Sequence, residues 1–209
     1  MEAFLAIVIE QAKQQSLTEA AAVLFSLMYP YLAARQNIWC WFCALVSTSL
    51  YVHVFWQGSL PFNSFLNVYY LLMAIYGWVR WRKNSQGEEL PVRVYPLFYH
   101  ITAIAVLVVA GLTLNHLVTF SWIKTDLYLD ALVTVFSVYA TYLMANKILE
   151  NWLFWIVINF AAAYLYFING LMLTGLMFIG YFFMSVYGYR NWQRDYQQQG
   201  NSTPNSLMD

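Results

Sequence analysis

The sequence predicts an all-α integral membrane protein with seven transmembrane helices, arranged as two parallel three-helix repeats joined by a linker helix. Three observations support this fold class. Of the 209 residues, 61% are hydrophobic and only 10% are charged, against about a quarter in a soluble domain. Seven hydrophobic runs follow one another, and the first three match the last three at a constant offset. Seven spans of about 20 residues leave little chain for an aqueous domain.

Polar or turn residues bound the seven runs and set the expected helix limits. We expect spans at residues 18–34, 38–56, 61–81, 95–122, 127–145, 151–168 and 172–192. The first run is the least apolar, because it begins beside Glu19 and contains Pro30. The transmembrane domain is expected at residues 16–194, with repeat 1 at about 18–82, the linker helix at about 95–122 and repeat 2 at about 127–193.

The two ends of the chain lie outside these spans. Residues 1–15 combine an apolar strip with Glu2, Glu10 and Lys13, and they lack the basic start and cleavage site of a signal peptide. We expect an amphipathic helix on the bilayer surface, and disorder of this segment stays open. Residues 195–209 are polar and rich in glutamine, so we expect a disordered tail.

The basic residues predict how the chain is oriented in the membrane. With seven spans, one side would hold eight of the ten, namely Arg35, Arg80, Arg82, Lys83, Arg93, Lys147, Arg190 and Arg194. The other side would hold Lys13 and Lys124. Since basic loops stay in the cytoplasm, we expect the N-terminus outside and the C-terminus inside.

The internal repeat aligns residues 19–81 with residues 130–192, which lie 111 positions later, without a gap. Of the 63 aligned positions, 14 are identical, among them the pairs Trp41/Trp152, Gly77/Gly188 and Trp81/Trp192. Because a single span separates the copies, both enter the membrane in the same direction, as in some transporters. We expect Gly77, Gly188, Trp81 and Trp192 to have structural or gating roles.

Several kinds of chemistry are not expected. No glycine-rich phosphate-binding loop is present, and the ten basic residues balance ten acidic ones, which gives no basic surface for nucleic acid. Cys40 and Cys43 form a C-x-x-C without a second ligand pair. His53, His100 and His116 have no acid beside them in the spans and are expected to pack between helices. We therefore expect no metal, no cofactor and no enzyme activity.

One helix face combines rings with an amide. Trp152, Trp155 and Asn159 share a face by the i, i+3, i+7 rule, which suits stacking of a flat ring and hydrogen bonding to it. Asn67, Tyr76 and Tyr187 are further candidates on the last helix of each repeat. The alternative, an aromatic belt with an interhelical asparagine bond, stays open.

Charge within the spans favours one class of solute. Glu19 and Asp130 are repeat equivalents at the outer ends of their triplets, and intramembrane acids have either a structural or a cation-binding role. We favour Asp130 as the binding residue and leave Glu19 as structural or gating. The spans offer aromatic faces, which attract cations, and no Lys or Arg for an anion except Arg80 and Arg190 at their cytoplasmic ends. A neutral or cationic heteroaromatic compound therefore fits best.

Three segments resemble the PnuC family of vitamin transporters. They are Lys147-Ile148-Leu149-Glu150-Asn151-Trp152-Leu153-Phe154-Trp155, Ile75-Tyr76-Gly77-Trp78-Val79-Arg80-Trp81 and Gly188-Tyr189-Arg190-Asn191-Trp192. The resemblance covers nearly the whole membrane portion and implies a bacterial inner-membrane carrier with the 3+1+3 helix order of SWEET transporters. It implies uptake of nicotinamide riboside by facilitated diffusion, followed by trapping through a cytoplasmic kinase.

The resemblance also implies substrate contacts at Trp152, Trp155, Asn159 and Asn67. The chain departs from the family pattern in two places, since it has Leu129-Asp130-Ala131 where Trp-Asp-Ser is frequent, and Asn67 where a glutamine is frequent. Thiamine, also a flat aromatic cation, is therefore an alternative substrate. A second class of function stays open, a non-transporting membrane binding or accessory subunit, and so does a homo-oligomer.

Overall fold

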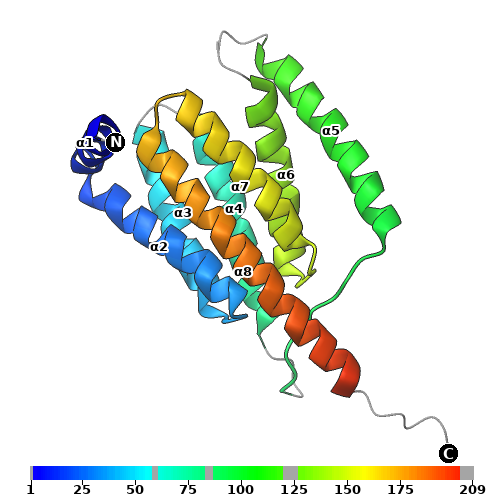
Figure 1. Cartoon of the computed structure of the whole chain (residues 1–209). Helices are drawn as coiled ribbons and strands as arrows, with labels where there is room; N and C mark the ends of the chain where they lie inside the picture. The colour runs from blue at the N-terminus through cyan, green and yellow to red at the C-terminus, as the bar shows by residue number, and fades with distance from the viewer. Residues whose placement is uncertain (1, 58–60, 83–86, 120–126, 203–209) are drawn as a thin grey trace, which may run out of the picture.

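The computed structural model describes residues 2–57, 61–82, 87–119 and 127–202. Within these residues the chain forms eight helices (Figure 1): α1 (Glu2–Lys13), α2 (Leu17–Ala34), α3 (Trp39–Gln57), α4 (Pro61–Trp81), α5 (Leu97–Thr119), α6 (Leu127–Ala145), α7 (Asn151–Ile168) and α8 (Met172–Ser202). Each of the seven predicted spans coincides with a helix. Residues 120–122 of the fourth span, together with Lys83 and Lys124, lie outside the described residues.

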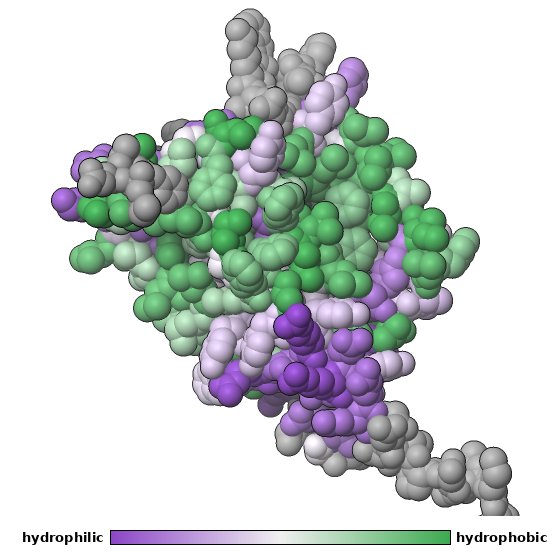
Figure 2. All heavy atoms as spheres, viewed as in Figure 1, coloured by the Kyte–Doolittle hydropathy of each residue, from purple (hydrophilic) through white to green (hydrophobic). Residues whose placement is uncertain are grey.

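Among the described residues, five helices are long and apolar enough to cross a bilayer, over Leu17–Ala34, Leu97–His116, Tyr128–Ala145, Asn151–Ile168 and Met172–Gln199, and Trp39–Val54 is a shorter apolar helix. Figure 2 shows a broad hydrophobic region over the middle of the molecule and hydrophilic side chains gathered at its lower end, beside the C-terminal part of α8. A helix can cross a bilayer because it satisfies its own backbone groups. The fold is therefore that of an all-helical, multi-pass membrane protein.

Both ends of the described chain are helical. The helix expected in residues 1–15 is present as α1 and is tied to the α7–α8 turn, because Gln11 Nε2 donates to the Gly170 carbonyl (2.9 Å) and the Leu173 N–H donates to Gln11 Oε1 (3.0 Å). The prediction of a disordered tail is wrong for residues 195–202, since α8 continues to Ser202. Glutamine is a good helix former, so this polar segment extends the preceding span. Residues 203–209 lie outside the described residues.

The start of α2 has a side-chain cap. The Ser16 N–H donates to Glu19 Oε2 (2.6 Å), and the Glu19 N–H donates to Ser16 Oγ (3.2 Å). This capping box satisfies two backbone groups that the first turn of a helix would otherwise leave unpaired. Glu19 therefore has a structural contact at the end of α2.

The helices pack in two groups of three. In the first group α2 packs on α3 and α3 on α4, and in the second α6 packs on α7 and α7 on α8. The groups meet where α2 contacts α8 and where α4 contacts α6. In Figure 1, α5 stands at the outer edge of the bundle, beside α6. The contacts of the two groups therefore match helix by helix.

Glycines allow close contact within each group. A Cβ atom added to Gly77 in α4 would overlap the indole of Trp41 in α3, and one added to Gly188 in α8 would overlap the indole of Trp152 in α7. All four residues are buried. Small residues let membrane helices approach closely, so each glycine leaves room for one buried tryptophan side chain.

The segment before α5 is tied to the α6–α7 turn. The Arg93 N–H donates to the Lys147 carbonyl (2.9 Å), and the Leu149 N–H donates to the Arg93 carbonyl (2.8 Å). This pairing brings the first turn of α5 beside the start of α7, where His100 Nε2 lies 3.7 Å from Glu150 Oε2. The expectation that no acid lies beside the histidines is therefore wrong for His100, because the two residues are brought together by a tertiary contact.

Candidate substrate-binding site

A cavity of about 300 Å³ lies between α2, α3, α4, α6, α7 and α8. Its aromatic lining residues are Tyr29, Trp41, Tyr51, Tyr70, Trp152, Trp155, Tyr166, Phe178 and Tyr181. Hydroxyl and amide groups from both groups of helices complete the wall, among them Ser26, Thr48, Asn67, Ser137, Asn159 and Ser185. A concave, mostly apolar cavity with a few polar groups is the usual form of a small-molecule site.

Five of the residues proposed from the sequence line this cavity. Trp152, Trp155 and Asn159 come from one face of α7, Asn67 comes from α4 and Asp130 comes from the first turn of α6. The tertiary structure therefore brings together groups that are up to 92 positions apart, from Asn67 to Asn159. Their joint placement makes this cavity the candidate binding site.

Two other candidates lie elsewhere. Tyr76 is exposed, and its hydroxyl donates to Asn146 Oδ1 (3.1 Å), while Tyr187 is 43% exposed. Neither lines the cavity, so the structure does not bring them together with the other candidates. Tyr70 and Tyr181 face the cavity, and six residues further along a helix the side chain points about 120° away. Tyr76 and Tyr187 therefore fall on another face.

The repeat register would have found several lining residues that side-chain patterns alone did not. Trp41, Thr48 and Tyr70 are the repeat equivalents of Trp152, Asn159 and Tyr181, and all six line the cavity. The Tyr181 hydroxyl of α8 donates to Ser26 Oγ of α2 (2.8 Å), and this bond joins one helix group to the other. The repeat equivalents of these two residues, Tyr70 of α4 and Ser137 of α6, also line the cavity.

The indole nitrogens offer donors to a ligand. In the part of the chain that the structure describes, Trp41 Nε1, Trp152 Nε1 and Trp155 Nε1 are buried and have no hydrogen-bond partner. Buried donors are normally paired, because an unpaired one costs about 1–3 kcal/mol. Each of these three cavity-lining residues therefore has an unused donor.

Among the described residues, one end of the cavity is more exposed than the other. Asp130, which lines it, is exposed, whereas Trp41, Met144 and Trp152 at the opposite end are 1% exposed. Beyond them lie Trp81 and Trp192, which pack edge-to-face on Trp41 (5.4 Å between ring centroids) and Trp152 (5.5 Å), respectively. This layer of four indoles closes the cavity on the side of the arginine-rich turns.

Hydrogen bonds hold the indole layer across the two helix groups. Trp81 Nε1 in α4 donates to the Ala145 carbonyl of α6 (3.1 Å), and Trp192 Nε1 in α8 donates to the Ala33 carbonyl of α2 (3.0 Å). Each donor therefore belongs to one group and each acceptor to the other. Separating the groups at this end would break both bonds.

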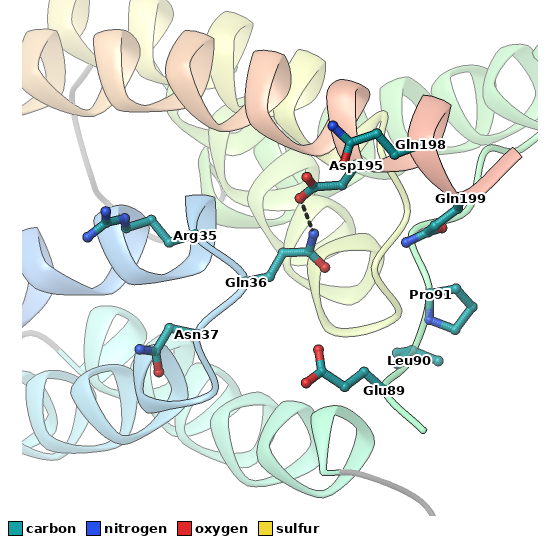
Figure 3. Close-up of a pocket in the computed structure, with 9 residues that line it drawn as sticks. All are labelled: Arg35, Gln36, Asn37, Glu89, Leu90, Pro91, Asp195, Gln198 and Gln199. Carbon is teal, nitrogen blue, oxygen red and sulfur yellow. Dashed lines mark hydrogen bonds between the residues drawn. The ribbon is translucent and has the colours of Figure 1, made fainter. Parts of the chain in front are cut away.

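A polar chain lies outside the indole layer. Lys147 Nζ donates to Gln36 Oε1 (2.8 Å), and Gln36 Nε2 donates to Asp195 Oδ2 (2.6 Å), as Figure 3 shows for the second bond. Gln36 and Lys147 are repeat equivalents, and both have φ near +53°. The Lys147 amine also lies 4.7 Å from the centre of the Trp81 ring, and burial lowers its pKa. Gln36, Lys147 and Asp195 are called the Lys147 clasp here. They join the α2–α3 turn, the α6–α7 turn and α8.

The clasp borders a second, larger cleft of about 830 Å³ (Figure 3). Its described lining is polar and of mixed charge, including Arg35, Glu89 and Asp195, and contains no aromatic ring. It offers a flat ring no stacking partner, so it is not the candidate site. Among the described residues no group of three His, Cys, Asp or Glu could hold a metal ion.

Comparison with known proteins places this fold in a family. The family model described as "Nicotinamide mononucleotide transporter" matches residues 16–194. The chain belongs to this family. The predicted resemblance to PnuC transporters is thereby confirmed, and the relatives found are transporters, not enzymes.

This chain is similar to other members of the nicotinamide mononucleotide transporter family over most of their length. The chain is 27% identical to the nicotinamide riboside transporter PnuC of Escherichia coli (strain K12), over 88% of this chain and 87% of that protein. It is 26% identical to the riboflavin/roseoflavin transporter RibM of Streptomyces davaonensis, over 77% of each. A crystal structure of the vitamin B3 transporter PnuC shares the fold, with a TM-score of 0.71 and 24% identity over 93% of this chain and 90% of that one.

Proposed function

We propose that this chain is a bacterial inner-membrane carrier that takes up nicotinamide riboside by facilitated diffusion. The observation that carries the proposal is the cavity that places Trp155, Asn159 and Asp130 together in a member of this transporter family. Nicotinamide riboside has a flat pyridinium cation, a carboxamide and ribose hydroxyls. Indole faces attract such a cation, and the Trp152 and Trp155 indoles line the cavity.

The lining favours the riboside over its phosphate. The family model is described by the mononucleotide, which carries a phosphate. The described lining contains an acid, Asp130, and neither Lys nor Arg. Proteins bind phosphate with bidentate arginine or with lysine, and a carboxylate would repel it. Nicotinamide riboside therefore fits this cavity better than its mononucleotide.

We also propose the finer architecture and orientation. The matched contacts of α2–α4 and α6–α8 support two parallel repeats of three spans, at about 18–82 and 127–193, with α5 as the linker in a 3+1+3 order. The positive-inside rule assigns the arginine-rich end to the cytoplasm and the Asp130 end to the outside. Transport would then proceed by rocking of one repeat against the other around the cavity.

Uptake into proteoliposomes tests the proposed function. Labelled nicotinamide riboside should equilibrate across the membrane without an ion gradient or ATP, and the labelled mononucleotide should stay outside. Enclosing a riboside kinase with ATP should convert equilibration into accumulation, because the phosphorylated product would be trapped. Accumulation above the outside concentration without the kinase would show that transport is coupled to an energy source.

Two alternatives to this function, thiamine as the substrate and a non-transporting accessory subunit, predict different results in binding and uptake measurements. Thiamine is also a flat aromatic cation, so calorimetric titration with thiamine and with nicotinamide riboside decides between the two substrates. A non-transporting accessory subunit would show no uptake of either compound, although its aromatic face could bind a partner helix. Empty vesicles of the same lipids serve as the control.

Replacing Asp130 with asparagine should reduce affinity only for a charged ligand. The exposed carboxylate lines the open end of the cavity, where a charge interaction is worth about 1 kcal/mol, or about fivefold in Kd. We expect a fivefold weaker Kd for nicotinamide riboside and an unchanged Kd for its reduced, uncharged dihydro form, both measured by calorimetry.

Glu19→Gln is the matched control for Asp130→Asn. Glu19 is the repeat equivalent of Asp130, but it caps α2 instead of lining the cavity, and glutamine can also complete a capping box. We expect both Kd values to be unchanged in this variant. Equal losses of the charged and the uncharged ligand in Asp130→Asn would contradict the proposed charge role.

Breaking the Lys147 clasp should open the closed end. In Lys147→Met the amine can no longer donate to Gln36. A charge-assisted hydrogen bond contributes about 1.5–3 kcal/mol, so its loss should raise the population of the open form by at least about tenfold. Cys40 is fully buried in the same cluster as Trp41 and serves as an internal probe. On a Cys43→Ser background, we expect about tenfold faster labelling of Cys40 by a membrane-impermeant maleimide added on the arginine-rich side.

The direction of labelling tests the orientation as well as the clasp. Inside-out vesicles should show the faster labelling, and right-side-out vesicles should not. Lys13→Met, which removes an exposed lysine of α1, should label as slowly as the parent. Unchanged labelling in Lys147→Met would rule out the clasp as a closure of this end.

A further inference from the structure

Ser185 bonds to the amide that faces the cavity. It lies on α8, is 2% exposed and lines the cavity beside Asn159 of α7. Ser185 Oγ donates to the Tyr181 carbonyl one turn earlier (2.8 Å), and Asn159 Nδ2 donates to Ser185 Oγ (3.1 Å). The two hydrogen bonds form a continuous chain from Asn159 to the backbone of α8.

The hydroxyl chemistry fixes which end of the amide faces the ligand. A serine hydroxyl has a single hydrogen, and that of Ser185 is used by the Tyr181 carbonyl. Ser185 Oγ can then only accept from Asn159, so the atom of the amide beside it must be the nitrogen. Asn159 Oδ1 therefore points away from Ser185 and is left as an acceptor for a bound solute.

We propose that Ser185 is a positioning residue that locks Asn159 with its carbonyl oxygen toward the ligand, and so selects a solute with an N–H donor over one with a carboxylate. This inference rests on the proposed function. A carboxamide can donate to Asn159 Oδ1, whereas a carboxylate has only acceptor atoms and would face another acceptor. Without Ser185 the amide could turn and donate Nδ2 to a carboxylate.

The first repeat has no pair of residues equivalent to Asn159 and Ser185, so the two halves of the cavity differ. Thr48 is the repeat equivalent of Asn159 and Ala74 that of Ser185. The Thr48 hydroxyl donates to the Ala44 carbonyl of its own helix (2.8 Å), and Ala74 has no polar side chain. A pseudo-symmetric cavity would bind an asymmetric ligand in two orientations. The Asn159–Ser185 pair therefore selects the orientation that places the amide beside α7.

The selectivity between two ribosides tests this role. The ligands are nicotinamide riboside and nicotinic acid riboside, in which a carboxylate replaces the carboxamide, and the Kd of each is measured by calorimetry on the purified full chain. The wild type should prefer the amide. In Ser185→Ala the ratio of the two Kd values should fall about fivefold, which is the size expected for one hydrogen bond, mainly through tighter binding of the acid.

Two variants serve as controls. Ser185→Thr keeps the hydroxyl and should keep the ratio. Ser49→Ala removes a hydroxyl that does not line the cavity and that donates to the Leu45 carbonyl of its own helix (2.7 Å), and it should also keep the ratio. A change in the ratio in either control, or an unchanged ratio in Ser185→Ala, would overturn the positioning role while the proposed function stands. If the wild type bound neither riboside, the proposed function would be wrong. The proposed role of Ser185 in selectivity would then be wrong as well.

Discussion

Trp155→Ala should weaken binding of nicotinamide riboside by about a hundredfold and abolish measurable uptake. The indole lines the cavity, and its Nε1 is buried without a partner among the described residues. Removing it takes away a cation–π contact of about 2 kcal/mol and a hydrogen-bond donor worth about 1 kcal/mol. Together these losses correspond to about two orders of magnitude in Kd, measured by calorimetry and by initial uptake rates.

Two further substitutions separate the ring from its N–H group. Trp155→Phe keeps an aromatic face without the donor, so its Kd should lie between those of the wild type and Trp155→Ala. Trp56→Ala removes an indole that is 67% exposed and should leave the Kd unchanged. Wild-type affinity in Trp155→Ala would move the stacking site away from α7 and support the alternative of an aromatic membrane belt.

Gly77→Ala should destabilise the folded protein, although it adds only one methyl group. The new Cβ would overlap the indole of Trp41, which is buried and also packs edge-to-face on Trp81. Overpacking of this kind costs about 1–3 kcal/mol, which lowers the melting temperature of a chain of this length by about 5 °C. Thermal unfolding followed by circular dichroism in detergent measures the shift.

Gly180→Ala is the matched control, because a Cβ at Gly180 in α8 would meet no atom within 4 Å. Alanine is a better helix former than glycine by about 1 kcal/mol, so the melting temperature should be equal or higher. Gly188→Ala, whose Cβ would overlap Trp152, should behave like Gly77→Ala. An unchanged melting temperature in both Gly77→Ala and Gly188→Ala would contradict the close packing of these helices.

The spans could be predicted because a bilayer imposes a simple rule on the sequence. Each crossing segment must be apolar and must pair its own backbone groups, so α6 (Leu127–Ala145) and α7 (Asn151–Ile168) begin and end at the predicted residues. The same rule gives no information on a polar helix outside the bilayer. The helical continuation of α8 to Ser202 was therefore not predicted.

Part of the candidate site was also predictable. Trp152, Trp155 and Asn159 share one helix face, which needs only the helical period, and Asp130 stands out because charge is rare in the spans. Tyr76 and Tyr187 have the same residue types as cavity-lining tyrosines but face elsewhere. Periodicity groups residues on a face without saying which neighbour that face meets.

The sequence alone determined a helical membrane protein with an internal repeat, since hydrophobic runs and a constant offset of 111 residues depend only on residue order. The tertiary structure decided which side chains meet. Contacts such as Tyr181 with Ser26 and Trp81 with Ala145 join helices far apart in the chain, through hydrogen bonds that depend on distances of a few tenths of an ångström. Such distances follow from the packing of whole helices, which no local pattern of residues records.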